Sequence, residues 1–317
     1  MKFISSLLLS LSIASFVHAQ KIDQTTRNFD GAPPSSVTSE KSGGNQGVGT
    51  SDSGAQRPIF LDTEKVSAFV GYDAKITYRS NPLTLSGDLT QAKTGIYQNS
   101  FYGGASLSPI DTDSAVITPV FGGSWTMSDY LNDNLSSLND YATSAYALLM
   151  IQHETGIGFR AGSSYANVRN NDSDTEDYSE FYPSVGAMKT YSINADTLAI
   201  LDISGGMHLT KSDSLIGSST QSLDNWDASF SYSLRHSYGD FIFTPGYRLS
   251  YKKFTEDGTV NDGRKDVTHS LSLRAEYSLE ENLKLSANTS YTRRNSNVST
   301  DYKSYDAGFV IGLNFNF

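Results

Sequence analysis

The chain has 317 residues, a formal net charge of −10 and no cysteine. The lack of cysteine excludes disulfides, thiolate metal sites and a lipidated N-terminal cysteine, and the acidic balance argues against nucleic acid as a partner, since its binders need a basic face. Hydrophobic residues make up only 38% of the chain, whereas tyrosine, phenylalanine and glycine are abundant at 19, 16 and 26 residues. This composition is typical of strands that alternate lipid-facing and water-facing side chains.

The first residues have the pattern of an export signal. Lys2 precedes a mostly apolar run over residues 3–17, and Val17-His18-Ala19 before Gln20 fits a small-x-small cleavage site. The run is too short for a stable transmembrane helix, and no other stretch approaches the roughly eighteen apolar residues that one needs. We therefore expect residues 1–19 to be a signal peptide, and any membrane association to be through strands.

Residues 20–64 differ in composition from the rest of the chain. They are rich in Ser, Gly, Thr, Gln and Asp, with Pro33-Pro34 and few large apolar residues. Such a segment buries too little surface to offset its ordering entropy. We expect a disordered periplasmic segment here, followed by one folded domain over residues 65–317.

From Val66 onward the side chains alternate with a period of two. In the first expected strand, Val66–Arg79, apolar residues such as Val70 and Ile76 alternate with residues such as Asp73 and Lys75. Ten further candidate strands follow, at residues 97–107, 115–125, 144–152, 157–168, 181–191, 198–210, 226–235, 241–254, 269–279 and 283–293. Segment 144–152 is apolar through its middle and also fits a buried helical turn. We expect bulges at Pro119, Pro183 and Pro245, because proline donates no ladder hydrogen bond.

The last expected strand covers residues 305–317, and the links between strands set the topology. Five short links alternate with six longer ones, so twelve strands leave both chain ends on the short-link side. Outer-membrane barrels have an even strand number, short periplasmic turns and longer external loops, and a lipid-exposed sheet edge cannot persist in hydrocarbon. The sequence therefore predicts an all-β fold, a closed antiparallel transmembrane β-barrel of about twelve strands.

The C-terminal strand carries a candidate assembly signal. Its alternate residues are apolar or aromatic, namely Tyr305, Phe309, Ile311, Leu313, Phe315 and Phe317. This run resembles the C-terminal signal of bacterial outer-membrane proteins, which in that family is read by the barrel-assembly machinery. More broadly, the region after Val66 resembles the beta-barrel porins and other twelve-stranded barrels. The resemblance implies a place in the bacterial outer membrane, with outer-membrane lipid and the barrel-assembly machinery as partners.

The opposite phase of the strands carries charged side chains that we expect to line the lumen. These candidates are Asp73, Lys75, Arg160, Asp202, His208, Asp227, Arg235, Arg248, Lys252, Arg274, Glu276 and Lys284. Two interpretations remain open: the charges line a water-filled pore and select solutes, or they form a salt-bridge network that fills the barrel. The later strands hold most of the basic residues, which resembles the arginine-lined porins for acidic oligosaccharides and favours anions.

Catalytic and metal-binding patterns are weak. His236-Ser237 and His269-Ser270 are adjacent pairs whose side chains point to opposite faces of a strand, and His208 shares a face with Thr210 without an evident orienting acid. The acidic run at residues 170–177 lacks the glycine and terminal glutamate of an EF-hand loop. We therefore expect no enzyme activity, no cofactor and no metal.

The predicted function is a porin-like outer-membrane channel for passive diffusion of small hydrophilic solutes. The alternative is a structural or adhesive barrel that binds partners through its external loops or its periplasmic segment. A third interpretation is an autotransporter-type translocator, although the segment before the barrel is too short and polar for a convincing passenger.

Overall fold

The computed structural model describes residues 66–82, 93–211, 223–255, 261–298 and 301–317. The expected signal peptide and the expected disordered segment lie outside these residues. Within them, no helix is long and apolar enough to cross a membrane.

The fold consists of long antiparallel strands. The first six elements are β1 (Val66–Arg79), β2 (Thr94–Leu107), the two-residue β3 (Ile110–Asp111), β4 (Ala115–Tyr130), the 3-10 helix η2 (Asp133–Leu138) and β5 (Asp140–His153). They are followed by β6 (Ile157–Asn170), β7 (Glu176–Asn194), β8 (Thr197–Lys211), β9 (Asn225–Tyr238), β10 (Phe241–Phe254), β11 (Lys265–Glu280), β12 (Leu283–Ser296) and β13 (Tyr302–Asn316).

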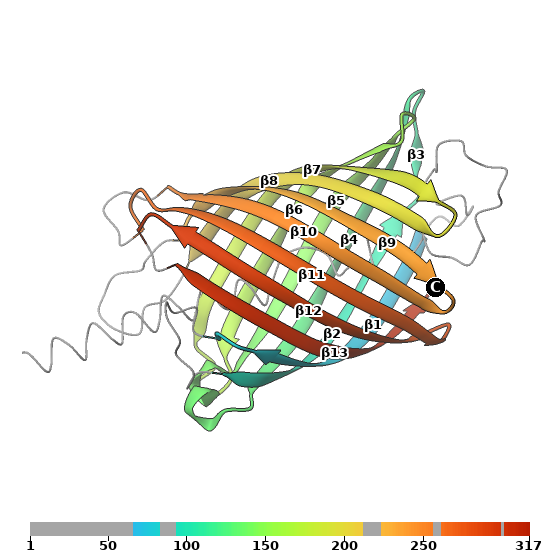
Figure 1. Ribbon diagram of the computed structural model, residues 1–317. Coiled ribbons are helices and arrows are strands. Elements are labelled where there is room, and N and C mark those ends of the chain that lie inside the picture. Colours follow the sequence, from blue (N-terminus) through green and yellow to red (C-terminus); the bar gives the residue numbers. More distant parts are fainter. Residues whose placement is uncertain (1–65, 83–92, 212–222, 256–260, 299–300) are drawn as a thin grey trace, which may run out of the picture.

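The sheet closes on itself into a barrel (Figure 1). Each long strand pairs antiparallel with the next one, β1 pairs with both β2 and β13, and β3 pairs only with β4 inside the β2–β4 link. Past the end of β13, Phe317 continues the closing seam: its N–H donates to the Ala68 carbonyl at 2.8 Å, and the Ala68 N–H donates to the Phe317 carbonyl at 3.0 Å. The prediction of a closed antiparallel barrel of twelve long strands is confirmed.

The two faces of the barrel differ in chemistry as the period of two predicts. Large apolar side chains such as Phe101, Ile203 and Phe309 face outward, with exposed fractions of 52%, 55% and 67%. Polar side chains on the other face, such as Asp306 and Asn314, are buried. An apolar outer face on strands of fourteen residues or more suits the hydrocarbon layer of a membrane.

Segment 144–152 is a strand and not a helical turn. It forms most of β5, which pairs along its length with β4 and β6. Neighbouring residues of the apolar run point to opposite faces of the barrel. Leu149 is exposed on the outside, whereas Leu148 is buried on the inside.

The expected bulges at the three prolines are wrong. Pro119 pairs in register with Leu149 on β5, and Pro183 pairs in register with Ser163 on β6. The β9–β10 ladder has the same register before and after Pro245, so no residue is inserted there. Pro119 lies beyond the last pair of β2 with β4, so its missing N–H costs no ladder bond there. The register shifts lie instead near Val168, Ser192 and Ser278, at strand ends.

The links also differ from expectation in length. Figure 1 shows the short hairpins and the C-terminus at one end of the barrel and η2 at the other. At the η2 end, which we take as external, the β6–β7 link is reduced to residues 171–175 because both strands extend further than the alternation indicated. The described external loops are therefore more compact than predicted.

Candidate functional site: the barrel lumen

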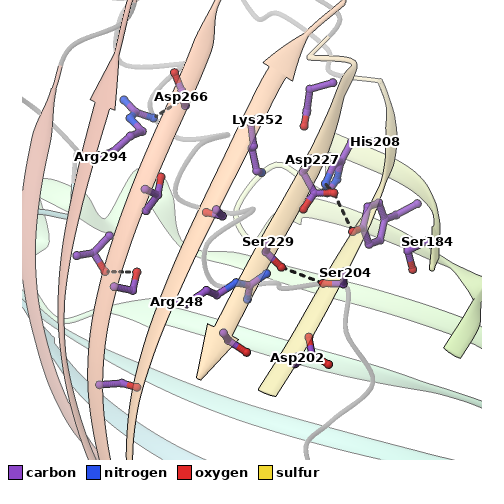
Figure 2. A pocket seen from close by; sticks show the side chains of 18 of the residues that line it. Ser184, Asp202, Ser204, His208, Asp227, Ser229, Arg248, Lys252, Asp266 and Arg294 are labelled. Carbon is purple, nitrogen blue, oxygen red and sulfur yellow. Dashed lines mark hydrogen bonds and ion pairs between the residues drawn. The ribbon is translucent and has the colours of Figure 1, made fainter. Parts of the chain in front are cut away.

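A cavity of about 680 Å³ lies inside the barrel. Its walls come from inward side chains of strands β5 to β13, together with Arg79 at the end of β1. Figure 2 shows charged and hydroxyl side chains from neighbouring strands pointing into this space. The period of two explains this arrangement, since every second residue of each strand must point to the barrel axis.

Small hydroxyl side chains form a band along one side of the cavity. Ser204 and Ser229 lie on paired strands, and their Oγ atoms are 2.9 Å apart (Figure 2). Ser270 and Thr292 repeat this contact between β11 and β12, with 3.3 Å between their hydroxyl oxygens. Further hydroxyls in the cavity wall belong to Ser184, Ser231, Ser233, Ser250, Thr268, Ser272 and Ser290.

An arginine–carboxylate pair spans three strands of this wall. Arg160 on β6 forms a bidentate contact with Asp202 on β8, and its Nη2 donates to Asp202 Oδ1 at 2.9 Å. The guanidinium crosses β7 at Gly186, where a Cβ would lie only 2.7 Å from Arg160 Cζ. Glycine at this inward position therefore permits the pair to form.

His208 lies between two carboxylates. Its Nδ1 is 3.0 Å from Glu180 Oε1, and its Nε2 is 3.5 Å from Asp227 Oδ1. Tyr182 stacks on the imidazole with ring centroids 4.1 Å apart, and its hydroxyl donates to Asp227 Oδ1 at 2.9 Å. A neutral imidazole has one N–H, so only the doubly protonated ring can donate to both carboxylates. Tyr182 packs against Gly206, where a Cβ would come within 2.5 Å of its ring.

The external end of the cavity contains two further ion-pair groups. Arg264 donates from Nε to Asp266 Oδ1 at 3.0 Å, and Arg294 Nη1 lies 3.7 Å from Asp266 Oδ2. Arg79 on β1 pairs with Asp306 on β13 through Nε and Oδ2 at 3.2 Å. All five side chains are buried. The basic groups at this end of the cavity therefore have carboxylate neighbours.

Six of the twelve lumen candidates line the cavity, namely Arg160, Asp202, His208, Asp227, Arg248 and Lys252. The other six lie on inward positions of their strands outside this cavity, namely Asp73, Lys75, Arg235, Arg274, Glu276 and Lys284. Among these, Arg274 Nη2 lies 2.9 Å from Glu276 Oε1. The cavity therefore brings together six candidates from strands β6, β8, β9 and β10.

The cavity also has charged residues that the sequence did not single out, namely Arg79, Glu180, Asp266, Arg294 and Asp306. Glu180, Asp266 and Arg294 lie just outside the expected strand ranges, since β7, β11 and β12 are longer than predicted. Extending the alternation by one to three residues at those strand ends would have placed them on the inner face.

The residues of the predicted assembly signal lie on the outer face of the barrel. Their exposed fractions run from 36% for Leu313 to 69% for Phe317. Tyr305, Phe309, Ile311 and Phe315 share this face. The alternate residues of β13 thus present a continuous apolar strip to the membrane.

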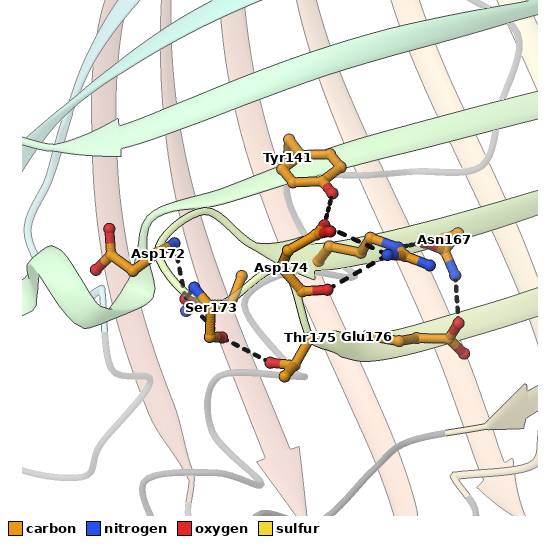
Figure 3. A network of polar contacts seen from close by, with 9 residues as sticks. Tyr141, Asn167, Asp172, Ser173, Asp174, Thr175 and Glu176 are labelled. Atoms are coloured by element: carbon orange, nitrogen blue, oxygen red, sulfur yellow. Dashed lines mark hydrogen bonds and ion pairs between the residues drawn. The ribbon is translucent and has the colours of Figure 1, made fainter.

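The β6–β7 loop has its own polar network (Figure 3). Asp174 adopts a left-handed backbone conformation with φ of 53°. Its carboxylate accepts hydrogen bonds from the Tyr141 hydroxyl and from Arg169 Nη1, the latter at 3.3 Å. These two hydrogen bonds hold the pKa of Asp174 below its usual value. The acidic run is thus tied to the barrel wall through this aspartate.

Of the histidines singled out in the sequence, His236 has its Nδ1 2.9 Å from the Thr197 hydroxyl, and His269 is separated from Ser270 by the sheet. His269 lies on the outer face, where its Nδ1 is 2.8 Å from the Tyr247 hydroxyl, whereas Ser270 faces the cavity. The Thr210 hydroxyl donates to Asp224 Oδ1 at 3.0 Å and accepts from the Leu223 N–H. Among the described residues, no group of three or more His, Asp or Glu side chains is placed to hold a metal ion.

Together, the closed sheet, the apolar outer face and the polar interior define a transmembrane β-barrel of the bacterial outer membrane. A family model described as "Putative MetA-pathway of phenol degradation" matches residues 239–314, which is less than half of the chain. No curated protein matches the chain in sequence.

Solved structures of outer-membrane proteins share this fold. An outer membrane channel from Pseudomonas putida F1 aligns with a TM-score of 0.50 and 12% identity, over 80% of this chain and 97% of that chain. The beta domain of the Bordetella autotransporter BrkA aligns with a TM-score of 0.43 and 10% identity, over 78% and 99% of the two chains. The KdgM porin in complex with disordered oligogalacturonate aligns with a TM-score of 0.40 and 12% identity, over 76% and 97%.

Proposed function

We propose that this barrel is a passive channel for small hydrophilic solutes. The observation that carries the proposal is the cavity of about 680 Å³ inside the barrel, whose wall is formed largely by charged and hydroxyl side chains. Such a lining holds water, and polar solutes can exchange hydrogen bonds with it as they pass. The channel fold of the P. putida protein supports the same role.

Energetics support an inward direction for the lumen charges. An Arg or Lys on the lipid face of a barrel costs about 2–4 kcal/mol near the midplane. Several such residues on the outside would rival the total stability of a typical domain, roughly 5–15 kcal/mol. The inward placement of Arg160, Arg248 and Lys252 avoids this cost and brings the charges into contact with water in the lumen.

Ion selectivity in planar bilayers tests the proposal. We expect purified protein to produce discrete conductance steps, and the double variant Arg248→Gln/Arg274→Gln to shift the reversal potential toward cations, because two inward positive charges are removed. Arg293→Gln is the matched control, since Arg293 is exposed on the outward phase of β12 and carries the same charge. A silent membrane, or a conducting double variant with unchanged reversal potential, would contradict the role of the lumen.

The second candidate is a structural or adhesive barrel. It is favoured by the apolar cluster of Ile96, Tyr130, Leu135 and Leu138, through which η2 packs against the strands at the external end. On this view the inner ion pairs brace the wall, and the loops bind a partner. Conducting steps would favour the channel, and a silent but correctly folded barrel would favour the structural role.

A further inference from the structure

On the basis of the proposed channel function, we infer that the preferred solutes are uncharged polyhydroxylated molecules of the sugar class. The inference rests on three features of the cavity: a wall of small hydroxyls, an apolar contact on the opposite side, and charges of both signs in equal number.

The hydroxyl wall spans consecutive strands. Ser204, Ser229 and Ser250 are in-register neighbours across β8, β9 and β10, and Thr268 continues the row on β11. A hydroxyl group both donates and accepts a hydrogen bond. A row of such groups can therefore replace the water around a polyhydroxylated solute at successive positions without requiring a charge.

The wall opposite the β11 end of this row contributes one apolar side chain. In the closed ring of twelve long strands, β5 lies six strands from β11, so the two face each other across the lumen. On β5, Leu148 lines the cavity and packs with Val120 and Tyr146. A sugar ring presents C–H groups on its faces and hydroxyls around its edge, so it can bury apolar surface against Leu148 while its hydroxyls exchange hydrogen bonds with the row.

The charges in the wall offer little net attraction to an ion. The cavity is lined by five basic residues (Arg79, Arg160, Arg248, Lys252 and Arg294) and five acidic ones (Glu180, Asp202, Asp227, Asp266 and Asp306). Arg160 is paired with Asp202, Arg79 with Asp306, and Arg294 with Asp266. Lys252 lies directly opposite Asp227 in the β9–β10 register. A charged solute therefore meets fields of both signs, whereas a neutral one needs no counter-charge.

The test measures block of the ionic current by added solutes in planar bilayers. We expect glucose to reduce the current in a saturable manner, and glucuronate and protonated glucosamine, which have the same ring, to block at least several-fold more weakly. Ser204→Ala/Ser229→Ala should weaken glucose block by a factor on the order of ten, since two hydrogen-bonding groups of the row are removed. Thr143→Ala removes an exposed hydroxyl from the outer face of β5. Glucose should block the current through this variant as strongly as it blocks the wild type.

The outcomes separate the solute class from the channel itself. Stronger block by glucuronate than by glucose, or equal glucose block in the serine double variant and the wild type, would overturn the inference. A current that glucose leaves unchanged would also overturn it, while the channel function would stand. No current at all, from protein whose folded state is verified by its electrophoretic mobility, would overturn the proposed function on which the inference rests.

Discussion

Single residues of the lumen act through contacts that reach across strands. Arg160 and Asp202 belong to strands that are not neighbours, and their contact passes over the bare backbone of Gly186. Their side chains are 28% and 20% exposed, so water screens the pair only in part. The contact between Arg160 and Asp202 therefore depends on the absence of a side chain at Gly186.

Gly186→Ala should displace the Arg160 guanidinium and separate it from Asp202. We expect the barrel to fold with a loss of about 1–2 kcal/mol in the free energy of unfolding, less than the roughly 3–5 kcal/mol for breaking a fully buried pair. Denaturant unfolding in detergent measures this loss. Gly246→Ala is the matched control, because its nearest neighbour is the Ser272 hydroxyl at 3.1 Å. Equal stability of the two variants would show that Gly186 has no such role.

Asp174 should make the β6–β7 loop sensitive to acid. Because its folded pKa is lowered, the hydrogen bonds from Tyr141 and Arg169 stabilise the loop above the unfolded pKa of about 3.9 and are lost as the pH falls through the folded value. The chain has no cysteine, so Asp172→Cys provides a single site for a spin label. We expect label mobility to rise below about pH 4.

The control for the acid effect is Asp174→Asn in the same labelled chain. An amide does not titrate in this range, so the mobility of the label should no longer depend on pH between neutrality and strong acid. The same acid transition in both proteins would assign the effect to another group.

At the scale of elements, β13 closes the barrel and carries the predicted assembly signal. It pairs with β1 and β12, and Phe317 adds two backbone hydrogen bonds to Ala68 beyond the last strand residue. Its ring is 69% exposed on the outer face. The C-terminal aromatic side chain is thus free to contact the membrane or the assembly machinery.

Phe317→Asp should lower the amount of assembled barrel in the outer membrane severalfold. A carboxylate replaces an apolar ring on the lipid-facing phase of the closing strand, which costs free energy in the membrane and removes the aromatic end of the predicted signal. Quantitative immunoblotting of outer-membrane fractions measures the effect. Asn316→Asp adds the same charge one residue earlier, on the opposite phase, and should assemble normally. Wild-type levels of the Phe317→Asp protein would refute the assembly role.

At the scale of the whole molecule, both edges of each of the twelve long strands are paired with another strand. The ring from β1 through β13 and back leaves no open edge for detergent or for another chain to invade. Unfolding must therefore break several ladders together, so it should be cooperative and slow.

Closure should make the electrophoretic mobility depend on heating. We expect unboiled protein in dodecyl sulfate to migrate as a compact species, and boiled protein to migrate near the mass of the unfolded chain. Semi-native gels over a temperature series provide the measurement. Identical mobility with and without boiling, together with extraction of the protein from membranes by carbonate, would contradict the transmembrane barrel.

The sequence alone determined the architecture. A period of two over long segments, twelve such segments and an apolar C-terminal strand are local patterns, and each follows from the alternation of side chains along a strand. The alternation alone also predicts the inner face for Asp202, His208 and Arg248, and all three line the cavity. The bulge expected at Pro119 was wrong, because whether a missing N–H costs a hydrogen bond depends on where the neighbouring strand ends.

Only the tertiary structure decided which charges meet. Arg160 pairs with Asp202 across an intervening strand, and His208 lies between Glu180 and Asp227 from two different strands. These contacts depend on the register of several ladders and on the space above Gly186 and Gly206, which residue types and spacing do not encode locally. The period of two decides on which face of the strand a side chain lies. The register of the ladders and the closure of the barrel decide which charged side chains meet, and therefore how the charges inside the lumen are balanced.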